Sequence, residues 1–237
     1  MKQKGAAQSI IAFYDKESPS ATEFRRVYTS LKSSANGQNK LQTLLVTSAT
    51  VGEGKSIVSS LLSITAASLV KSRVAVVDLD LRRPKLQDYF ALSSGPGVAD
   101  VLTGKSNIKS VTRATGIPNL SIITAGKAAI PPSDIFDQAD LAAFVQELKF
   151  YFDTVIIDSP PIIPVSDPML IADRVDGVLI VVKSGVTQRE VVNRAINLLN
   201  NAGVKLLGVI LNDFESVLPY YYKDRYYGYH YSYSRKK

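Results

Sequence analysis

The stretch LLVTSATVGEGKS, residues 44–56, decides the fold. Its first four residues are apolar or β-branched and predict a buried strand, and a largely apolar segment of helical length begins at Lys55. Between the two lies the pattern G-x-x-x-x-G-K-[ST], with Ala49 in place of the first glycine. Glycines let backbone N–H groups turn toward an anion, and the start of the helix adds the positive end of its dipole. The stretch therefore predicts a phosphate-binding loop, the P-loop.

The side chains of the P-loop have separate expected tasks. Lys55 should reach the β- and γ-phosphates of a nucleotide, and the Ser56 hydroxyl should bind Mg²⁺. A chance glycine turn before a helix is the alternative, which the lysine, the serine and the strand–loop–helix context all disfavour. The residues expected to contact the nucleotide in this loop are Ala49, Val51, Gly52, Glu53, Gly54, Lys55, Ser56 and Ile57.

Strands and helices alternate along the chain after residue 41. Six short runs rich in Val, Ile and Leu do not alternate with polar residues, which is typical of strands buried on both faces of a parallel sheet. These runs are residues 44–47, 74–78, 120–124, 154–158, 178–182 and 206–211. Helices are expected at residues 55–70, 133–151 and 188–202. The alternation predicts an α/β fold, a doubly wound, mainly parallel sheet flanked by helices, as in P-loop NTPases.

Two further strands end in aspartate. Asp78 and Asp80 lie in the segment VVDLDLRRP, residues 76–84, and Asp158 ends the run VIID, residues 155–158. Open α/β sheets bind ligands beyond the carboxyl ends of their strands, so these carboxylates can share one crevice with the P-loop. Carboxylate oxygens suit Mg²⁺. For each aspartate alone, a turn residue or a solvated strand end is the alternative.

The composition excludes several kinds of site. The 237 residues contain no cysteine, which excludes disulfides, zinc–thiolate sites and a cysteine nucleophile, and the single histidine, His230, excludes a multi-histidine metal centre. No apolar run approaches the about 18 to 20 residues of a membrane span, and no secretory signal follows the N-terminal lysines. We therefore expect a soluble, cytoplasmic protein. The net charge of +7 only weakly favours an anionic partner, and we expect no nucleic acid.

Residues 1–40 are expected to form an N-terminal arm with one helix, which covers a flank of the domain formed by residues 41–215. Ser20 and Glu23 have the spacing of a capping box. Asn36-Gly37 should end the helix. An apolar stripe with helical spacing lies between them and consists of Phe24, Val27, Tyr28 and Leu31.

Residues 216–237 are expected to form a flexible tail of unusual composition. Eight of the 12 tyrosines of the chain lie in its last 18 residues, which also carry five basic residues and one acidic residue, a net charge of +4. The segment has neither helical nor strand periodicity. A sticky aromatic segment that binds another molecule is the alternative. The tyrosines are Tyr220, Tyr221, Tyr222, Tyr226, Tyr227, Tyr229, Tyr231 and Tyr233.

The three motifs and the tail together resemble the bacterial tyrosine kinases, which are relatives of P-loop ATPases and control capsule and exopolysaccharide synthesis. Residues 48–56, 76–84 and 155–161 resemble the Walker A, A′ and B motifs of that family, and the resemblance covers nearly all of residues 20–237. It implies an enzyme that transfers phosphate from ATP, with Mg²⁺, to protein tyrosines. The eight tail tyrosines would be the phosphoacceptors.

The resemblance also implies roles for individual residues. Asp78 would be the base that faces the tyrosine hydroxyl, and Asp80 and Asp158 would shape the Mg²⁺ site directly or through water. Arg82, in the pattern D-x-D-x-R, would hold phosphate or organise the loop. Asn212 resembles the position that meets the adenine ring in related ATPases.

The partners implied by the resemblance are a transmembrane adaptor similar to polysaccharide co-polymerases, further copies of the chain and a phosphotyrosine phosphatase. The chain resembles the stand-alone cytoplasmic kinase, which such an adaptor recruits to the inner face of the membrane. The ring-forming motif of the family, E-x-x-R-x-x-R, is incomplete, because Glu23 and Arg26 are present but Thr29 holds the third position. The size of the oligomer stays open.

Two other functions stay open. A ParA/MinD-type positioning ATPase shares the sheet and an aspartate after the second strand, although Thr50 stands where that class carries a signature lysine. An ATP-dependent scaffold that regulates a polysaccharide polymerase would use the same binding residues as a kinase. If the chain is a kinase, a tail of 18 residues reaches at most about 60 Å when extended, which is enough for phosphorylation between neighbouring subunits.

Overall fold

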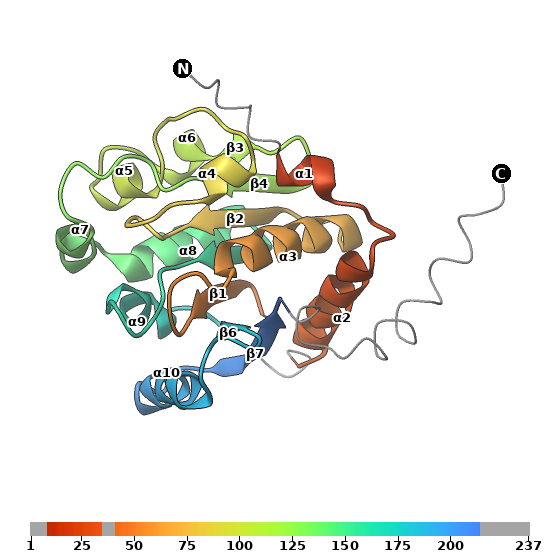
Figure 1. Ribbon diagram of the computed structural model, residues 1–237. Coiled ribbons are helices and arrows are strands. Elements are labelled where there is room, and N and C mark those ends of the chain that lie inside the picture. Colours follow the sequence, from red (N-terminus) through yellow and green to blue (C-terminus); the bar gives the residue numbers. More distant parts are fainter. Residues whose placement is uncertain (1–8, 35–40, 214–237) are drawn as a thin grey trace, which may run out of the picture.

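The computed structural model of the chain describes residues 9–34 and 41–213, and its centre is a seven-stranded sheet (Figure 1). The strand order is β3-β4-β2-β5-β1-β6-β7, and all neighbours pair in parallel except β3 with β4. The strands are β1 Thr43–Ser48, β2 Val74–Asp78, β3 Arg113–Ala114, β4 Leu120–Ile123, β5 Thr154–Asp158, β6 Gly177–Lys183 and β7 Leu206–Asn212. The predicted fold class is confirmed. The eight tail tyrosines and Asn36-Gly37 lie outside the described residues.

Helices cover both faces of the sheet. The helices on one face are α1 Ile10–Phe13, α2 Pro19–Ser34, α3 Lys55–Leu69 and α4 Leu86–Tyr89. Those on the other face are α5 Val98–Leu102, α6 Ile108–Val111, α7 Pro132–Gln138, α8 Leu141–Tyr151, α9 Asp167–Ala172 and α10 Arg189–Asn201. Within the described residues, none of these helices is both long enough and apolar enough to cross a bilayer.

The strands lack polar alternation because the core has two halves, one on each face of the sheet. In β1, Leu44 and Val46 pack into the half that contains α2 and α3, while Leu45 packs into the half that contains α8 and α10. Successive side chains of a strand point to opposite faces, so a strand covered on both sides needs apolar residues at every position. This arrangement leaves the ends of the strands as the places for polar groups.

The first described long helix, α2, begins two residues earlier than predicted. Its first residue is Pro19, and the Ser18 hydroxyl accepts the Ala21 N–H at 3.2 Å. Proline suits the first position of a helix because the N–H that it lacks would be left unpaired there. The prediction of a capping box at Ser20 was therefore wrong, and Ser18 caps the helix.

The predicted helix at residues 133–151 is divided into α7 and α8. The carboxylate of Asp140 accepts the Ala143 N–H at 2.9 Å and starts α8 as an N-cap. Aspartate at this position satisfies a backbone donor that a new helix leaves unpaired. The apolar periodicity continues through the break, so the pattern alone did not reveal it.

Asp176 ties the starts of β1 and β6 together. Its Oδ2 accepts the backbone N–H groups of Gln42 and Thr43 at 2.9 and 2.7 Å, and its Oδ1 lies 2.7 Å from Lys149 Nζ on α8. Burial alone would raise the pKa of Asp176, but the hydrogen bonds from Lys149, Thr43 and Gln42 together outweigh burial and lower it. The ionised carboxylate therefore stabilises the fold.

We predict that Asp176→Asn lowers the free energy of unfolding at pH 7 by about 2 kcal/mol, because hydrogen bonds to a charged group are lost. The folded pKa lies below the unfolded value of about 4, so this contribution is present above pH 4 and is lost as the pH falls through the folded pKa. Urea denaturation at pH 7 and pH 3 measures both effects. Asp173→Asn, at an exposed ion pair with Arg174, should change little. Equal losses in the two variants at pH 7 would refute the prediction.

Candidate active site

The P-loop joins the carboxyl end of β1 to the first turn of α3 (Figure 1). Gly52 and Gly54 have φ angles of +80° and +87°, a left-handed backbone that favours glycine. At Gly54 a Cβ atom would also lie only 2.0 Å from Asn212 Nδ2. Ala49 is not among the described residues with positive φ, so the loop accepts alanine in place of the first glycine.

Three side-chain contacts hold the P-loop in shape. The buried carboxylate of Glu53 accepts the Thr50 N–H at 2.9 Å and also accepts a hydrogen bond from the Thr187 hydroxyl. The Asn212 amide donates to the Glu53 carbonyl at 2.9 Å. Glu53 thus braces the loop from within, and Asn212 lies directly beside it at the end of β7. Thr187 was missed from the sequence, because its polar pair depends on the packing of β6 against β1.

The ends of β2 and β5 bring the acidic residues together. Asp78 and Asp158 are partners in the register of these two adjacent strands. Asp80 Oδ2 lies 3.1 Å from Lys55 Nζ, and Asp158 Oδ1 accepts a hydrogen bond from Ser59 at 3.2 Å. The cluster therefore joins the residues of three sequence motifs at one edge of the sheet.

Asp78 is fully buried at the end of β2. Its Oδ2 accepts the N–H groups of Lys85 and Leu86 at 3.1 and 3.0 Å, and its Oδ1 accepts the Asp80 N–H at 3.2 Å. Burial, with the charges of Asp158 and Asp80, raises the pKa of Asp78 to about 8. Its oxygens thus shape the loop that follows β2, and its side chain is not among those that line the cavity.

Asp158 has a buried oxygen that no described group satisfies. Burial raises the pKa of Asp158 to about 6, against the opposing effects of Lys55 and of hydrogen bonds from Ser56 and Ser59. Its Oδ2 has no hydrogen-bond partner among the described residues. An unpaired buried carboxylate oxygen fits a nearby cation or a water bound to one.

The acidic cluster is too sparse to hold a metal ion by itself. In the described part of the chain, no three His, Cys, Asp or Glu side chains are arranged to do so. Mg²⁺ in proteins commonly takes one or two carboxylates together with water and substrate phosphates. The donors near the P-loop, Ser56, Asp80 and Asp158, therefore fit Mg²⁺ that arrives with a nucleotide.

Arg82 points to another element of the fold. Its Nε lies 2.6 Å from Asp167 Oδ2 and its second guanidinium nitrogen 3.1 Å from Oδ1, so the two groups form a fork. Asp167 is only 3% exposed and begins α9. The contact ties the loop after β2 to the segment after β5. Asp167 was missed from the sequence, since an Asp-Pro pair is common at helix starts.

These loops surround a cavity of about 550 Å³. Of the residues predicted to contact nucleotide or metal, it is lined by Val51, Gly52, Gly54, Lys55, Ser56, Ile57, Asp80 and Arg82. Arg83, Lys85 and Tyr89 add basic and aromatic side chains to the lining, which also includes Pro160 and Pro161. The predicted residues Ala49, Glu53, Asp158 and Asn212 are not among those that line it. Four basic residues against one acidic residue make the lining cationic, and a cationic hollow of this size suits a polyanionic small molecule.

A glycine loop at a helix start, with acids at neighbouring strand ends, defines the P-loop NTPase class. In agreement, a family model described as ParA, NUBPL iron-transfer P-loop NTPase, matches residues 39–226. The putative tyrosine-protein kinase CapB of Staphylococcus aureus is 30% identical over 94% of this chain and 99% of its own length. Tyrosine-protein kinase Ptk of Acinetobacter johnsonii is 35% identical over 68% of this chain, a match that spans 22% of the Ptk protein.

The structural comparison gives the same answer. The kinase domain of Escherichia coli tyrosine kinase ETK superposes with a TM-score of 0.80 and 29% identity, over 89% of this chain and 82% of that one. Within the P-loop NTPases, the chain belongs to the family of bacterial tyrosine-protein kinases.

We predict that Asp158→Asn stabilises the nucleotide-free protein by about 2 kcal/mol at pH 8, because it removes a buried carboxylate with an unpaired oxygen. The folded pKa of about 6 exceeds the unfolded value of about 4, so the carboxylate destabilises the protein as the pH rises from 4 to 6. The advantage of the variant should therefore be full above pH 6 and vanish near pH 4. Thermal denaturation across this range tests it, and a less stable variant at pH 8 would contradict it.

Proposed function

We propose that this kinase transfers the γ-phosphoryl group of ATP to tyrosines 220–233 of a second copy of the chain. The observation that carries the proposal is the convergence of Lys55, Ser56, Asp80 and Asp158 at one edge of the sheet, in a chain with eight tyrosines in its last 18 residues. The kinase relatives support the reaction class. A length of about 60 Å for the extended tail supports transfer between copies.

The residues of the P-loop bind and orient the nucleotide. Backbone N–H groups of residues 51–56 face the phosphates, and Lys55 offsets negative charge on the transferred group. Asn212, beside the loop, contacts the adenine ring. Bound Mg²⁺, held by Ser56, Asp80 and Asp158 directly or through water, would neutralise charge on the phosphates. Arg82, tied to Asp167, keeps the loop that carries Asp80 against the site.

The acceptor phenol must lose a proton as its oxygen bonds to phosphorus. The new Oη–P bond forms, the bond between the γ-phosphorus and the bridging oxygen breaks, and ADP leaves with that electron pair. We assign the proton to the carboxylate of Asp78, which lies beside Asp158 at the edge of the sheet where the P-loop begins. Asp80, which lines the cavity, is the neighbouring carboxylate against which this assignment is tested.

We further propose that the kinase regulates capsular or exopolysaccharide synthesis and export. Its partners in this role are a transmembrane adaptor, which recruits it to the inner face of the membrane, and a phosphotyrosine phosphatase, which reverses the modification. We also propose that the chain forms a homo-oligomer, which brings the tail of one copy close to the site of another. On α2, Glu23 and Arg26 form an exposed pair at 2.7 Å, which leaves this part of the incomplete E-x-x-R-x-x-R motif accessible to a neighbour.

We predict that the purified chain, incubated with ATP and Mg²⁺, gains phosphate on tyrosines 220–233, and that Lys55→Met lowers the rate at least about 100-fold, because the charge on the transferred group is no longer offset. Mass spectrometry of the tail peptides measures both. Lys71→Met removes an exposed lysine beyond α3 and serves as the matched control. Absence of tyrosine phosphate in a chain that binds ATP would favour a ParA-type ATPase, a function that the ParA family match also supports.

We predict that Asp78→Asn lowers kcat for tail phosphorylation about 100-fold or more and leaves the affinity for ATP within about threefold, because it removes a proton acceptor. Asp80→Asn should instead weaken ATP binding, since Asp80 pairs with Lys55 and lines the cavity. Steady-state kinetics and ATP titration separate the two. The reverse pattern would assign the proton to Asp80. Polysaccharide output that persists in an Asp78→Asn strain would favour the ATP-dependent scaffold.

A further inference from the structure

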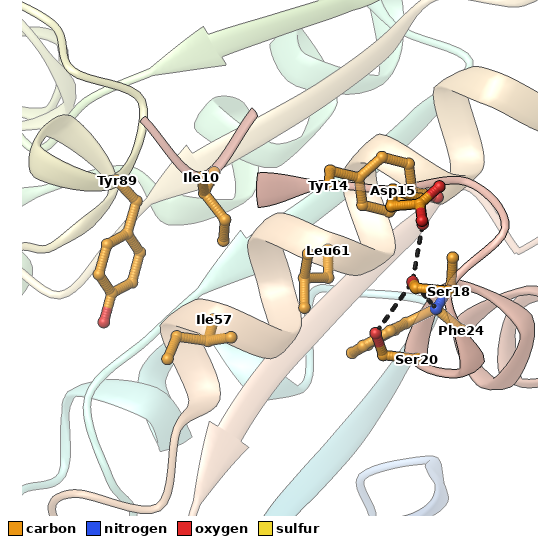
Figure 2. Close-up of a pocket in the computed structure, with 10 residues that line it drawn as sticks. Ile10, Tyr14, Asp15, Ser18, Ser20, Phe24, Ile57, Leu61 and Tyr89 are labelled. Atoms are coloured by element: carbon orange, nitrogen blue, oxygen red, sulfur yellow. Dashed lines mark hydrogen bonds between the residues drawn. The ribbon is translucent and has the colours of Figure 1, made fainter. Parts of the chain in front are cut away.

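A second pocket lies beside the active site, on the outer surface of α3 (Figure 2). Its volume is about 340 Å³, and its lining is mostly apolar and aromatic. The residues that form its apolar wall are Ile10, Tyr14, Phe24, Ile57, Leu61 and Tyr89. They come from α1, α2, α3, α4 and the segment between α1 and α2, so only the folded chain creates the pocket.

Hydrogen bonds hold the N-terminal wall of this pocket in place. The Tyr14 and Thr65 hydroxyls are 3.2 Å apart, which fastens the segment after α1 to α3. The Ser18 hydroxyl donates to the Asp15 carbonyl at 2.7 Å and accepts the Ala21 N–H at the start of α2. Figure 2 shows the contacts of Ser18 beside the pocket. The pocket is thus a formed hollow with an anchored wall.

The pocket adjoins the active-site cavity. Ile57 and Tyr89 line both hollows. Ile57 follows Ser56 directly, and Leu61 lies one helical turn further along the same face of α3. A chain segment that presents a hydroxyl at the P-loop can therefore place a neighbouring side chain in this pocket.

The tail of the chain has the matching chemistry. Each of its eight tyrosines has another tyrosine within two positions. Aromatic rings suit an apolar wall that itself contains two phenols, since ring pairs add to the gain from burial. Asp15 carries the only charge among the described lining residues, and the tail segment 220–237 has a net charge of +4. The aromatic rings of the tail match the apolar wall of the pocket, and its positive charge matches Asp15. The tail is therefore the occupant that the pocket fits best.

We propose that this pocket seats the ring of a tail tyrosine next to the acceptor, supplied by a second copy of the chain. The proposal rests on the function proposed above and adds to it which tyrosines the enzyme selects. A tyrosine flanked by another aromatic residue is preferred, because the flanking ring is buried while the acceptor hydroxyl faces the phosphate. Such a rule accounts for tyrosines that occur in close groups along the tail.

The test measures transfer between two distinguishable copies. An unlabelled enzyme is mixed with an acceptor chain that carries Lys55→Met and ¹⁵N, and mass spectrometry follows phosphate on Tyr221 of the labelled chain. Acceptors with Ala at both 220 and 222 lose the flanking rings, whereas acceptors with Phe there keep them without competing hydroxyls. We expect about tenfold faster modification of the Phe acceptor, the range expected for burial of one ring.

The enzyme variant Leu61→Lys tests the pocket itself. A lysine on this half-buried position places a cation opposite the basic tail, so we expect an about tenfold lower rate on the Phe acceptor and no remaining preference for Phe over Ala. Leu61→Met, which keeps an apolar side chain in the pocket, should retain both the rate on the Phe acceptor and the preference for Phe over Ala. Leu69→Lys, at a 47% exposed position at the end of the same helix, is the matched control and should leave rate and preference unchanged. ATP affinity should be the same in all these enzymes.

Equal rates on the Phe and Ala acceptors with the unaltered enzyme would overturn the proposal, as would an unchanged preference in Leu61→Lys. A loss of rate that Leu69→Lys shares would also overturn it, because the effect would not belong to the pocket. If the unaltered enzyme places no phosphate on any labelled tail tyrosine, transfer between copies itself fails. That result is distinct, since the pocket proposal alone fails only when phosphate transfer is observed.

Discussion

The position of β5 between β1 and β2 is the constraint on which the site depends. The register of this strand places Asp158 beside Asp78 on one side and beside Val46, just before the P-loop, on the other. Three motifs that are far apart in the sequence thereby end at the same edge of the sheet. Parallel pairing is essential, because it turns all three carboxyl ends in one direction.

The convergence of these motifs is unfavourable for stability, because it buries two carboxyl groups next to each other. Asp78 and Asp158 are both 0% exposed, and burial raises the pKa of each. Lys55 and the backbone N–H groups that Asp78 accepts offset part of the repulsion, but Asp158 Oδ2 remains unpaired among the described residues. Buried carboxylates held close together favour a site that gains stability when a cation and a nucleotide bind. The unfavourable burial of these carboxylates is therefore part of how the site binds its ligands.

Contacts outside the motifs determine the shapes of the loops. Glu53 is braced by Thr187, in the loop between β6 and α10, and by Asn212 at the end of β7. Arg82 is held by Asp167 at the start of α9. Each contact joins a motif residue to an element that carries no motif. The geometry of the site thus depends on contacts from elements across most of the sheet. The N-terminal segment forms one wall of the neighbouring pocket, where the Tyr14 hydroxyl meets that of Thr65.

The sequence by itself determined the alternation of strands and helices, the P-loop and the three candidate acidic residues. Its local signals suffice there because buried parallel strands must be apolar throughout and because a left-handed loop needs glycine at Gly52 and Gly54. It did not reveal the break before α8, the two-residue strand β3 or the cap at Ser18, since such short features carry too little periodicity. Only the tertiary structure decided that Asp78 lies buried while Asp80 lines the cavity, and that Arg82 meets Asp167. The physical reason is that these outcomes depend on which groups distant segments bring within hydrogen-bond distance, and spacing along the chain does not encode that distance.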